Sequence, residues 1–215
     1  LAAGQGTRLK SALPKPLHRI GGRPMLAWSL DAATAANAAR IVTILPRASE
    51  QIQNWLDGVE FCIQDKPRGT GHAALAAAPA LKDFDGVAVI MFADTPLVTA
   101  STLSRLAASV DDHTSLAVLG FETADPTGYG RLVTDSNGDV TRIVEHSDAT
   151  AVERCITLVN GGIMAVRCPL LFAWLEQVQA NNKSGEIYLT DIVELATQAG
   201  SKVACQIAYE AEIAG

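Results

Sequence analysis

The chain has 215 residues, 48% of them hydrophobic, and a formal net charge of -6. This composition supplies enough apolar side chains for a folded core and excludes an intrinsically disordered chain. The acidic balance, an aromatic content of only 5% and the lack of an apolar run of about 18 residues argue against a nucleic-acid binder and against membrane insertion.

The positive charge is concentrated at the start of the chain. Residues 1–30 carry five Lys and Arg and no acidic residue, and the remaining 12 basic and 23 acidic residues leave -11 for the rest. A basic segment on an acidic body is typical of a local anion site, and it is equally compatible with a solvated basic stretch.

The first residues look like the end of a strand that runs into a loop containing Gly4 and Gly6. Glycines permit positive φ angles and let a ligand approach backbone N–H groups closely. The dinucleotide-binding fingerprint would need a small residue where Leu9 stands, and no Gly-Lys-Ser/Thr sequence follows. The loop is therefore neither of the two common phosphate-binding loops.

Lys15 follows this loop between Pro14 and Pro16, and Arg8 precedes it. Because proline fixes its own φ and restricts the residue before it, we expect Lys15 to be held rigidly in an extended conformation. A rigid lysine and a fork-shaped arginine beside backbone donors suit the binding of a triphosphate.

The next segments predict alternating helices and strands. In chain order they are a helix at 25–38, a strand at 41–45, a helix at 48–56, a strand at 59–63, a helix at 72–78, a strand at 87–92, a helix at 100–108 and a strand at 115–121. The continuous apolar run at 87–92 is typical of a parallel strand covered on both faces. This alternation predicts an open α/β sheet with right-handed crossovers.

The pattern changes after Asp125. Segments 131–134 and 140–144 flank an Asn-Gly turn at 137–138 and predict an antiparallel hairpin, which we expect to form a lobe over the carboxyl edge of the sheet. A strand at 157–166, helices at 169–179 and 189–198, and a strand at 203–207 follow. We expect residues 1–215 to form a single mixed α/β domain.

Asp94 follows the apolar run at 87–92, at the edge where α/β sheets bind ligands. A carboxylate there is a suitable ligand for Mg²⁺, and an aspartate that caps the next helix is the alternative. The four cysteines, at positions 62, 155, 168 and 205, have no zinc-type spacing. We expect them to be reduced and buried in a cytoplasmic protein, since no signal peptide is recognisable.

Several motifs together resemble one family. They are LAAGQGTRL at 1–9, LPKPL at 13–17, Gln64 followed by GTGHA at 69–73, DPTGYGR at 125–131, VEHSDA at 144–149, NGGI at 160–163 and GEIYLTD at 185–191. In this order, they resemble the N-acetylglucosamine-1-phosphate uridylyltransferase (GlmU) family of sugar-nucleotide pyrophosphorylases over the whole sequence.

The resemblance implies a Rossmann-like open mixed sheet with a small antiparallel sugar-binding lobe. It also implies an enzyme that uses Mg²⁺ to transfer UMP from UTP to N-acetylglucosamine-1-phosphate, releasing pyrophosphate and making a cell-envelope precursor. Phosphoryl transfer of this kind depends on positioning and on neutralising charge.

The resemblance also implies the roles of individual residues. These are catalytic Arg8 and Lys15; nucleotide-binding Leu1, Ala2, Ala3, Gly4, Gln64, Gly69 and Thr70, with Gln64 and Thr70 on uracil; sugar-binding Gly130, Glu145, Asn160, Tyr188 and Thr190; and Asp94 as the metal ligand.

Two departures from the family pattern affect these expectations. The family usually has glycine where Ala93 stands, and a methyl group could crowd the sugar. The family takes a second metal ligand, an Asn, from just after a segment like 212–215. No hexapeptide repeat of the family's β-helix occurs in these residues, so we expect no acetyltransferase activity from this chain.

Three alternatives stay open. The first is a related sugar-1-phosphate nucleotidyltransferase with another substrate pair, such as dTTP and glucose-1-phosphate. The second, motivated by Ala93 and the missing Asn, is a non-catalytic module that binds nucleotide sugars. The third is a nicotinamide-dependent oxidoreductase, which Leu9 disfavours.

Overall fold

The structure, a computed structural model, describes residues 1–4, 6, 9–56 and 58–213. The strands are β1 (Arg19–Ile20), β2 (Arg23–Pro24), β3 (Val42–Pro46), β4 (Glu60–Gln64), β5 (Val87–Ile90), β6 (Thr114–Glu122), β7 (Arg131–Thr134), β8 (Val140–Val144), β9 (Leu158–Arg167) and β10 (Lys202–Ile207). The α-helices are α1 (Met25–Ala35), α2 (Glu50–Trp55), α3 (Thr70–Leu75), α4 (Ala78–Leu81), α5 (Ala100–Ala108), α6 (Cys168–Leu175), α7 (Ile192–Gln198) and α8 (Glu210–Ile213). Short 3-10 turns are η2 (Lys15–Leu17), η3 (Glu153–Cys155) and η4 (Leu189–Asp191).

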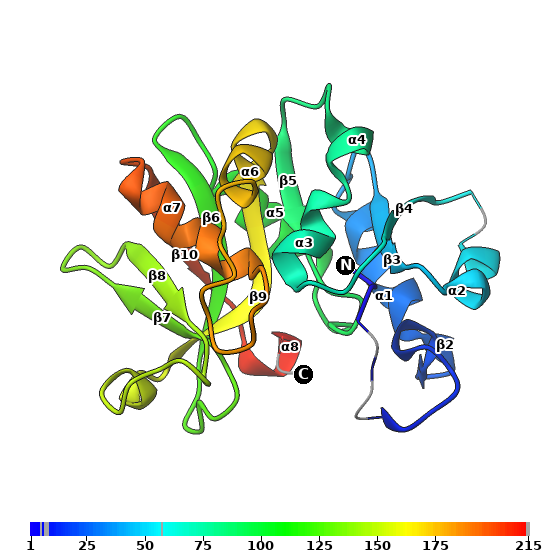
Figure 1. Cartoon of the computed structure of the whole chain (residues 1–215), viewed down its shortest axis with the longest axis horizontal. Coiled ribbons are helices and arrows are strands. Elements are labelled where there is room, and N and C mark those ends of the chain that lie inside the picture. The colour runs from blue at the N-terminus through cyan, green and yellow to red at the C-terminus, as the bar shows by residue number, and fades with distance from the viewer. Residues whose placement is uncertain (5, 7–8, 57, 214–215) are drawn as a thin grey trace.

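The larger sheet has the strand order β10-β6-β9-β7-β8, with β5 also pairing with β9 (Figure 1). β10 runs parallel to β6, whereas β6, β5 and β7 run antiparallel to β9. The sheet is therefore mixed, as expected for this fold class.

The core lies on both faces of β6, because its side chains alternate between two apolar clusters. Leu116 and Val118 pack in a cluster with residues of α6 and α7, whereas Ala117 and Leu119 pack with residues of α5. All four side chains have no exposed surface. Burying each large aliphatic side chain contributes roughly 1.5–3 kcal/mol. β6 is therefore the most enclosed strand, rather than the segment at 87–92.

Residues 1–3 connect this sheet to a second, parallel pair formed by β3 and β4. The Ala2 N–H donates to the Ile44 carbonyl at 2.8 Å, and the Ala93 N–H donates to the Leu1 carbonyl at 3.0 Å. The start of the chain thus lies between β3 and the segment after β5. This arrangement brings the glycine loop to the carboxyl ends of both strands.

The hairpin has the expected bounds, and its β7 strand joins the sheet where Arg131 lies opposite Val159. Figure 1 shows the β7–β8 ribbon splaying away from the sheet beneath α7. Among the residues that the structure describes, no helix is both long and apolar enough to cross a membrane.

Several expectations about the elements were wrong in detail. The helices expected at 25–38 and 169–179 end earlier, at Ala35 and Leu175. The segment at 87–92 forms a shorter strand that is antiparallel to β9, because an apolar run does not encode strand direction. The helix expected at 72–78 is divided between α3 and α4, where Pro79 stands near the start of the second helix. The helix expected at 189–198 begins as the 3-10 turn η4.

The cysteines are unpaired, as expected, but they are not all buried. Cys168 is buried, Cys62 and Cys205 are half-buried, and Cys155 is exposed. Burial raises the pKa of the Cys205 thiol to about 11, so this group is an unreactive neutral thiol at physiological pH.

Candidate active site

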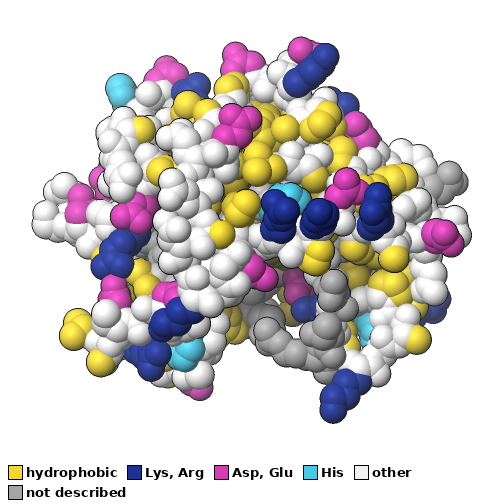
Figure 2. Space-filling view, in the orientation of Figure 1, with side chains coloured by type: hydrophobic (Ala, Val, Ile, Leu, Met, Phe, Trp, Pro, Cys, Tyr) yellow, Lys and Arg dark blue, Asp and Glu magenta, His cyan; other side chains and the backbone are white. Residues whose placement is uncertain are grey.

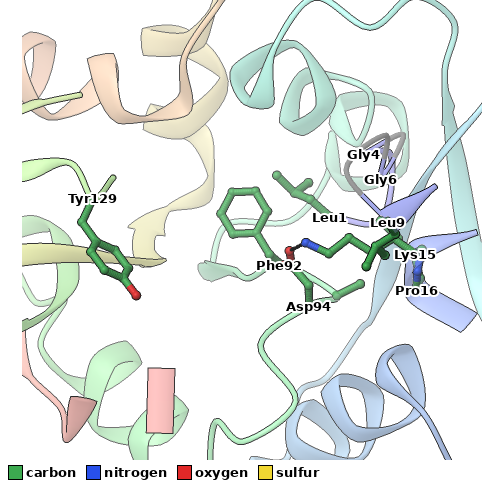
Figure 3. Close-up of a pocket in the computed structure, with 11 residues that line it drawn as sticks. Leu1, Gly4, Gly6, Leu9, Lys15, Pro16, Phe92, Asp94 and Tyr129 are labelled. Carbon is green, nitrogen blue, oxygen red and sulfur yellow. Dashed lines mark hydrogen bonds and ion pairs between the residues drawn. The ribbon is translucent and has the colours of Figure 1, made fainter. Parts of the chain in front are cut away.

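A cavity of about 550 Å³ opens where residues 1, 2, 4 and 6, η2 and the segment after β5 meet (Figure 3). Lys15 and Asp94 lie 79 residues apart in sequence, and in the cavity the Lys15 ammonium forms an ion pair with the Asp94 carboxylate. The side chains are 37% and 36% exposed, so both charges are available to a ligand in the cavity.

Local backbone structure positions both charged groups. Asp94 lies just beyond β5, where the Ala93 N–H is bound to Leu1 and the Thr95 hydroxyl donates to the Phe92 carbonyl at 2.8 Å. Lys15 is not extended as expected. It begins the 3-10 turn η2, in which the Leu17 N–H donates to the Pro14 carbonyl at 2.9 Å.

The glycine loop lies directly against Lys15. Gly6 has a φ of 59°, and a Cβ at this position would lie 2.8 Å from the Lys15 Cβ. Glycine is needed at position 6 both for this backbone conformation and for this close approach. Arg8, the other expected catalytic residue, lies outside the described residues.

A second cavity, of about 420 Å³, adjoins the first at Gly4 and is lined also by Ala3 and Gln64. Gln64 is buried, with its amide nitrogen donating to the Gly69 carbonyl at 3.1 Å and lying 3.1 Å from His72 Nδ1. These contacts fix the side-chain amide, whose oxygen remains a possible acceptor for a ligand.

The expected nucleotide-binding residues therefore lie in two groups. Leu1, Ala2 and Gly4 line the first cavity, and Ala3, Gly4 and Gln64 line the second. Gly69 and Thr70 line neither cavity; the Thr70 hydroxyl oxygen accepts the Leu189 N–H at 2.9 Å.

Four of the expected sugar-binding residues are brought together at the hairpin. The Thr190 hydroxyl donates to Glu145 Oε1 at 3.1 Å, and the Asn160 N–H donates to the Gly130 carbonyl at 2.8 Å. The Gly130 backbone also lies close to the Glu145 carboxylate. Burial raises the pKa of Glu145, and the hydrogen bond from Thr190 offsets this rise only in part.

Tyr188 lies nearby, with its hydroxyl 2.6 Å from Ser184 Oγ. It lines a third cavity, of about 500 Å³, together with Glu145 and three further acidic residues, Asp148, Asp191 and Glu194.

The two aromatic residues that line the first cavity, Phe92 and Tyr129, were not assigned a role from the sequence. Phe92 borders it on the side of Asp94, and Tyr129 faces it from the opposite side, with its hydroxyl directed inward (Figure 3). The Tyr129 ring packs edge-on against buried Phe121, with ring centroids 5.1 Å apart. Tyr129 lies inside the GYG part of a quoted motif, which is the signal that could have identified it.

Among the described residues, Asp94 is the carboxylate placed to hold a divalent cation at the first cavity. Within the described part of the chain, no group of three or more His, Cys, Asp or Glu side chains could hold a metal ion. Mg²⁺ commonly takes one or two protein carboxylates and completes its shell with water and substrate phosphates. The Asp94 carboxylate lines the cavity and forms an ion pair with the Lys15 ammonium, so it fits that requirement.

Ala93, the departure from the family pattern, is 5% exposed and belongs to an apolar cluster with Ala2, Leu26 and Leu45. It also lines the first cavity. Its methyl group is therefore part of the packed wall beneath the cavity.

The chain is similar to curated proteins over its whole length. It is 46% identical over 217 residues to the bifunctional protein GlmU of Maricaulis maris, and 42% identical over 225 residues to the bifunctional protein GlmU of Corynebacterium efficiens. These alignments cover 100% of this chain but 48% and 46% of the two relatives. The chain thus spans about half the length of the curated relatives it matches.

A solved structure supports the fold. The crystal structure of UDP-glucose pyrophosphorylase complexed with UDP-glucose matches with a TM-score of 0.76 and 19% sequence identity, covering 96% of this chain and 88% of that one. Residues 1–157 match the family described as the MobA-like NTP transferase domain. This match covers more than half of the chain, which therefore belongs to the family of MobA-like NTP transferase domains.

Proposed function

We propose that the chain transfers UMP from UTP to N-acetylglucosamine-1-phosphate, giving UDP-N-acetylglucosamine and pyrophosphate. The observation that carries the proposal is the Lys15–Asp94 pair in a glycine-lined cavity, between a cavity that contains Gln64 and the polar cluster around Glu145. The 46% identity to a bifunctional GlmU protein over the whole chain supports the same substrates.

In the reaction, a phosphate oxygen of the sugar phosphate attacks the α-phosphorus of UTP, and pyrophosphate leaves. Both reactants are anions, so catalysis consists mainly of alignment and charge neutralisation. The Lys15 ammonium is placed to neutralise negative charge on the phosphates, and the N–H groups of the glycine loop can donate to them.

The metal belongs to the proposal as well. Mg²⁺, when bound, would draw the phosphates together and reduce their charge. Asp94 is the residue that would hold it, and the Lys15 ammonium is then free to turn toward the phosphates.

Different groups are proposed to bind the uracil base and the sugar. Gln64 lies at the cavity proposed for uracil, where its amide suits an imide edge. Glu145 is proposed to accept hydrogen bonds from sugar hydroxyls, with Gly130, Asn160, Tyr188 and Thr190 around it. Among them, the Thr190 hydroxyl holds the Glu145 carboxylate.

We treat residues 1–215 as one nucleotidyltransferase domain, and we propose that they do not acetylate glucosamine-1-phosphate. A cytoplasmic location stays a prediction from the composition and cysteine usage of the sequence. Assaying acetyl transfer from acetyl-CoA to glucosamine-1-phosphate tests the first statement, and turnover by the 215-residue chain would contradict it.

The experiment that tests the function is pyrophosphate release with a panel of substrate pairs in the presence of Mg²⁺. We expect UTP with N-acetylglucosamine-1-phosphate to be the best pair. Faster release with dTTP and glucose-1-phosphate would establish the related specificity instead. Binding of UDP-N-acetylglucosamine with no release from any pair would establish a non-catalytic module.

A further inference from the structure

The segment at 68–71 is bound along residues 187–189, far away in the sequence. The Ile187 N–H donates to the Arg68 carbonyl and the Gly71 N–H donates to the Ile187 carbonyl, both at 2.8 Å. The Thr70 hydroxyl oxygen accepts the Leu189 N–H at 2.9 Å. Three hydrogen bonds therefore join the start of α3 to the chain that leads into η4.

The fit between these segments is close. Gly69 has a φ of 104°, and a Cβ at this position would collide with the Ile187 backbone. Leu189 is 2% exposed and Thr190 is 8% exposed, so the contact continues into the core. A hydrogen bond lost here leaves a buried N–H group without a partner, which is costly.

The same contacts lie on a continuous path between the two ends of the proposed site. Gln64 donates to the Gly69 carbonyl, and the next residue, Thr70, accepts from Leu189. The residue after Leu189 is Thr190, whose hydroxyl donates to the Glu145 carboxylate. The side chain at the base cavity and the carboxylate at the sugar end are thus connected through two hydroxyl groups.

We propose that Thr70 is a positioning residue that acts on the sugar end of the site through Leu189 and Thr190, rather than a group that reads uracil. The proposal rests on the proposed function, because it takes Glu145 as the acceptor for sugar hydroxyls. The Thr70 hydroxyl fixes the backbone at 189. This fixes the position of the Thr190 hydroxyl, which in turn orients the carboxylate.

Thr70→Val tests this, since valine keeps the shape and removes the hydroxyl. We expect the KM for N-acetylglucosamine-1-phosphate to rise by about tenfold, as for the loss of one buried hydrogen bond, while the KM for UTP changes less than about twofold. Thr70→Ser, which keeps the acceptor, is expected to restore both constants. A rise in the KM for UTP without a rise for the sugar phosphate would overturn the proposal in favour of a uracil contact.

A double-mutant cycle with Thr190→Val tests the path itself. We expect Thr190→Val to raise the KM for N-acetylglucosamine-1-phosphate as well. In the double variant, the rise in this KM should be smaller than the product of the rises in the two single variants. Independent, multiplying effects would show that Thr70 does not act through Thr190. Circular dichroism and melting temperatures check that each variant is folded.

Hydrogen exchange on the unaltered chain keeps the proposal testable if Thr70→Val does not fold. N-acetylglucosamine-1-phosphate alone is expected to slow amide exchange at 68–71 as well as at 187–190. Slowing at 187–190 alone would contradict the proposal. No pyrophosphate release by the unaltered chain would count against the proposed function, whereas release with the reversed KM pattern would count against Thr70 alone.

Discussion

At the scale of single residues, the Lys15–Asp94 pair serves binding rather than folding. Both side chains are more than a third exposed, and ion pairs of this kind contribute only about 0–1 kcal/mol to stability. Their place on the wall of the first cavity, beside Gly6, makes them available to bind a ligand. Removing either charge should therefore lower the activity of the chain and leave its stability nearly unchanged.

Lys15→Met is expected to lower the rate of pyrophosphate release by about 10²–10³-fold, because a preorganised charge at the phosphates is lost. The free energy of unfolding should change by less than about 1 kcal/mol. Initial rates and urea unfolding measure the two effects. Lys202→Met is the matched control. Lys202, at the start of β10, forms an ion pair with Asp139 and lines none of the three cavities. Equal activity of the two variants would contradict the role of Lys15.

Asp191 makes a prediction about pH. Its burial, together with the charges of Glu145, Glu194 and Asp148, raises its pKa from 3.8 to about 6. The folded chain then holds this proton more tightly than the unfolded chain. This contribution to stability is complete below about pH 4 and is lost as the pH rises through about 6.

Asp191→Asn removes this carboxylate. The variant is expected to be more stable than the unaltered chain by about 1 kcal/mol at pH 7.5, after allowance for solvent screening, and to show no gain at pH 4. Urea unfolding at both pH values measures the difference, with the exposed carboxylate of Glu176, as Glu176→Gln, for comparison. A gain of the same size at both pH values would point to packing instead.

Ala93→Gly tests the departure from the family pattern. Because Ala93 is packed in the cluster beneath the cavity, the variant is expected to lose about 1 kcal/mol of stability. Its KM for the sugar phosphate should change less than about threefold, since a single methyl group is worth little in binding. A large increase in turnover would show instead that the methyl group crowds the substrate.

At the scale of elements, the site depends on contacts between segments that are distant in sequence. Residues 1–3 hold the glycine loop between β3 and β5, and residues 187–189 hold the start of α3. Apart from the hydrogen bond to the Thr70 hydroxyl, these contacts are made by backbone groups, so the other bonded positions tolerate many side chains but not a change of backbone path.

Gly69→Ala tests the second contact, because the new Cβ would both strain the backbone and meet Ile187. We expect a loss of about 2–4 kcal/mol in the free energy of unfolding. The matched control is Gly138→Ala in the hairpin turn, where φ is also positive at 85° but no atom lies within 4 Å. It should lose only about 1 kcal/mol. Equal losses would mean that the contact with Ile187 is unimportant.

Local sequence patterns predicted the bounds of helices and strands better than they predicted which strands pair and in which direction. The hairpin at 131–144 was predicted with its observed bounds because an Asn-Gly turn and its flanking strands form one local unit. The direction of β5 was predicted wrongly, since its partner β9 is distant in the sequence and an apolar run fits either direction.

The site was predicted in the same uneven way. Single residues such as Lys15 and Asp94 were located by their motifs, and the structure brings these two together. The bond from Leu189 to Thr70 spans 119 residues and leaves no trace in either local sequence. Long-range contacts of this kind, and the 3-10 turn at Lys15, required the folded structure.

At the scale of the whole molecule, charge is distributed unevenly between the N-terminal residues 1–30 and the rest of the chain. Residues 1–30 carry five positive charges, whereas the chain as a whole has a net charge of -6. Figure 2 shows a row of Lys and Arg side chains over β4 and α3, beside the N-terminal part of the chain. The acidic cavity with Glu145, Asp148, Asp191 and Glu194 lies at the other end of the proposed site.

This distribution predicts salt-sensitive nucleotide binding. Raising the salt concentration from about 50 to 500 mM shortens the screening length severalfold, and the KM for UTP should rise at least about threefold. Initial rates across this range measure it, and melting temperatures at each salt concentration show whether folding is affected. A KM for UTP that does not depend on salt would mean that the basic segment does not contribute to binding.

The central claim is that this chain moves the uridylyl group and that Asp94 is required for the transfer. The most direct measurement uses UTP labelled at the α-phosphate and follows the label into UDP-N-acetylglucosamine in the presence of Mg²⁺, for the unaltered chain and for Asp94→Asn. We expect the label to appear in the nucleotide sugar with the unaltered chain, and at least about 10²-fold more slowly with Asp94→Asn. Label that stays in UTP with the folded, unaltered chain, or that transfers equally fast with the variant, would contradict the claim.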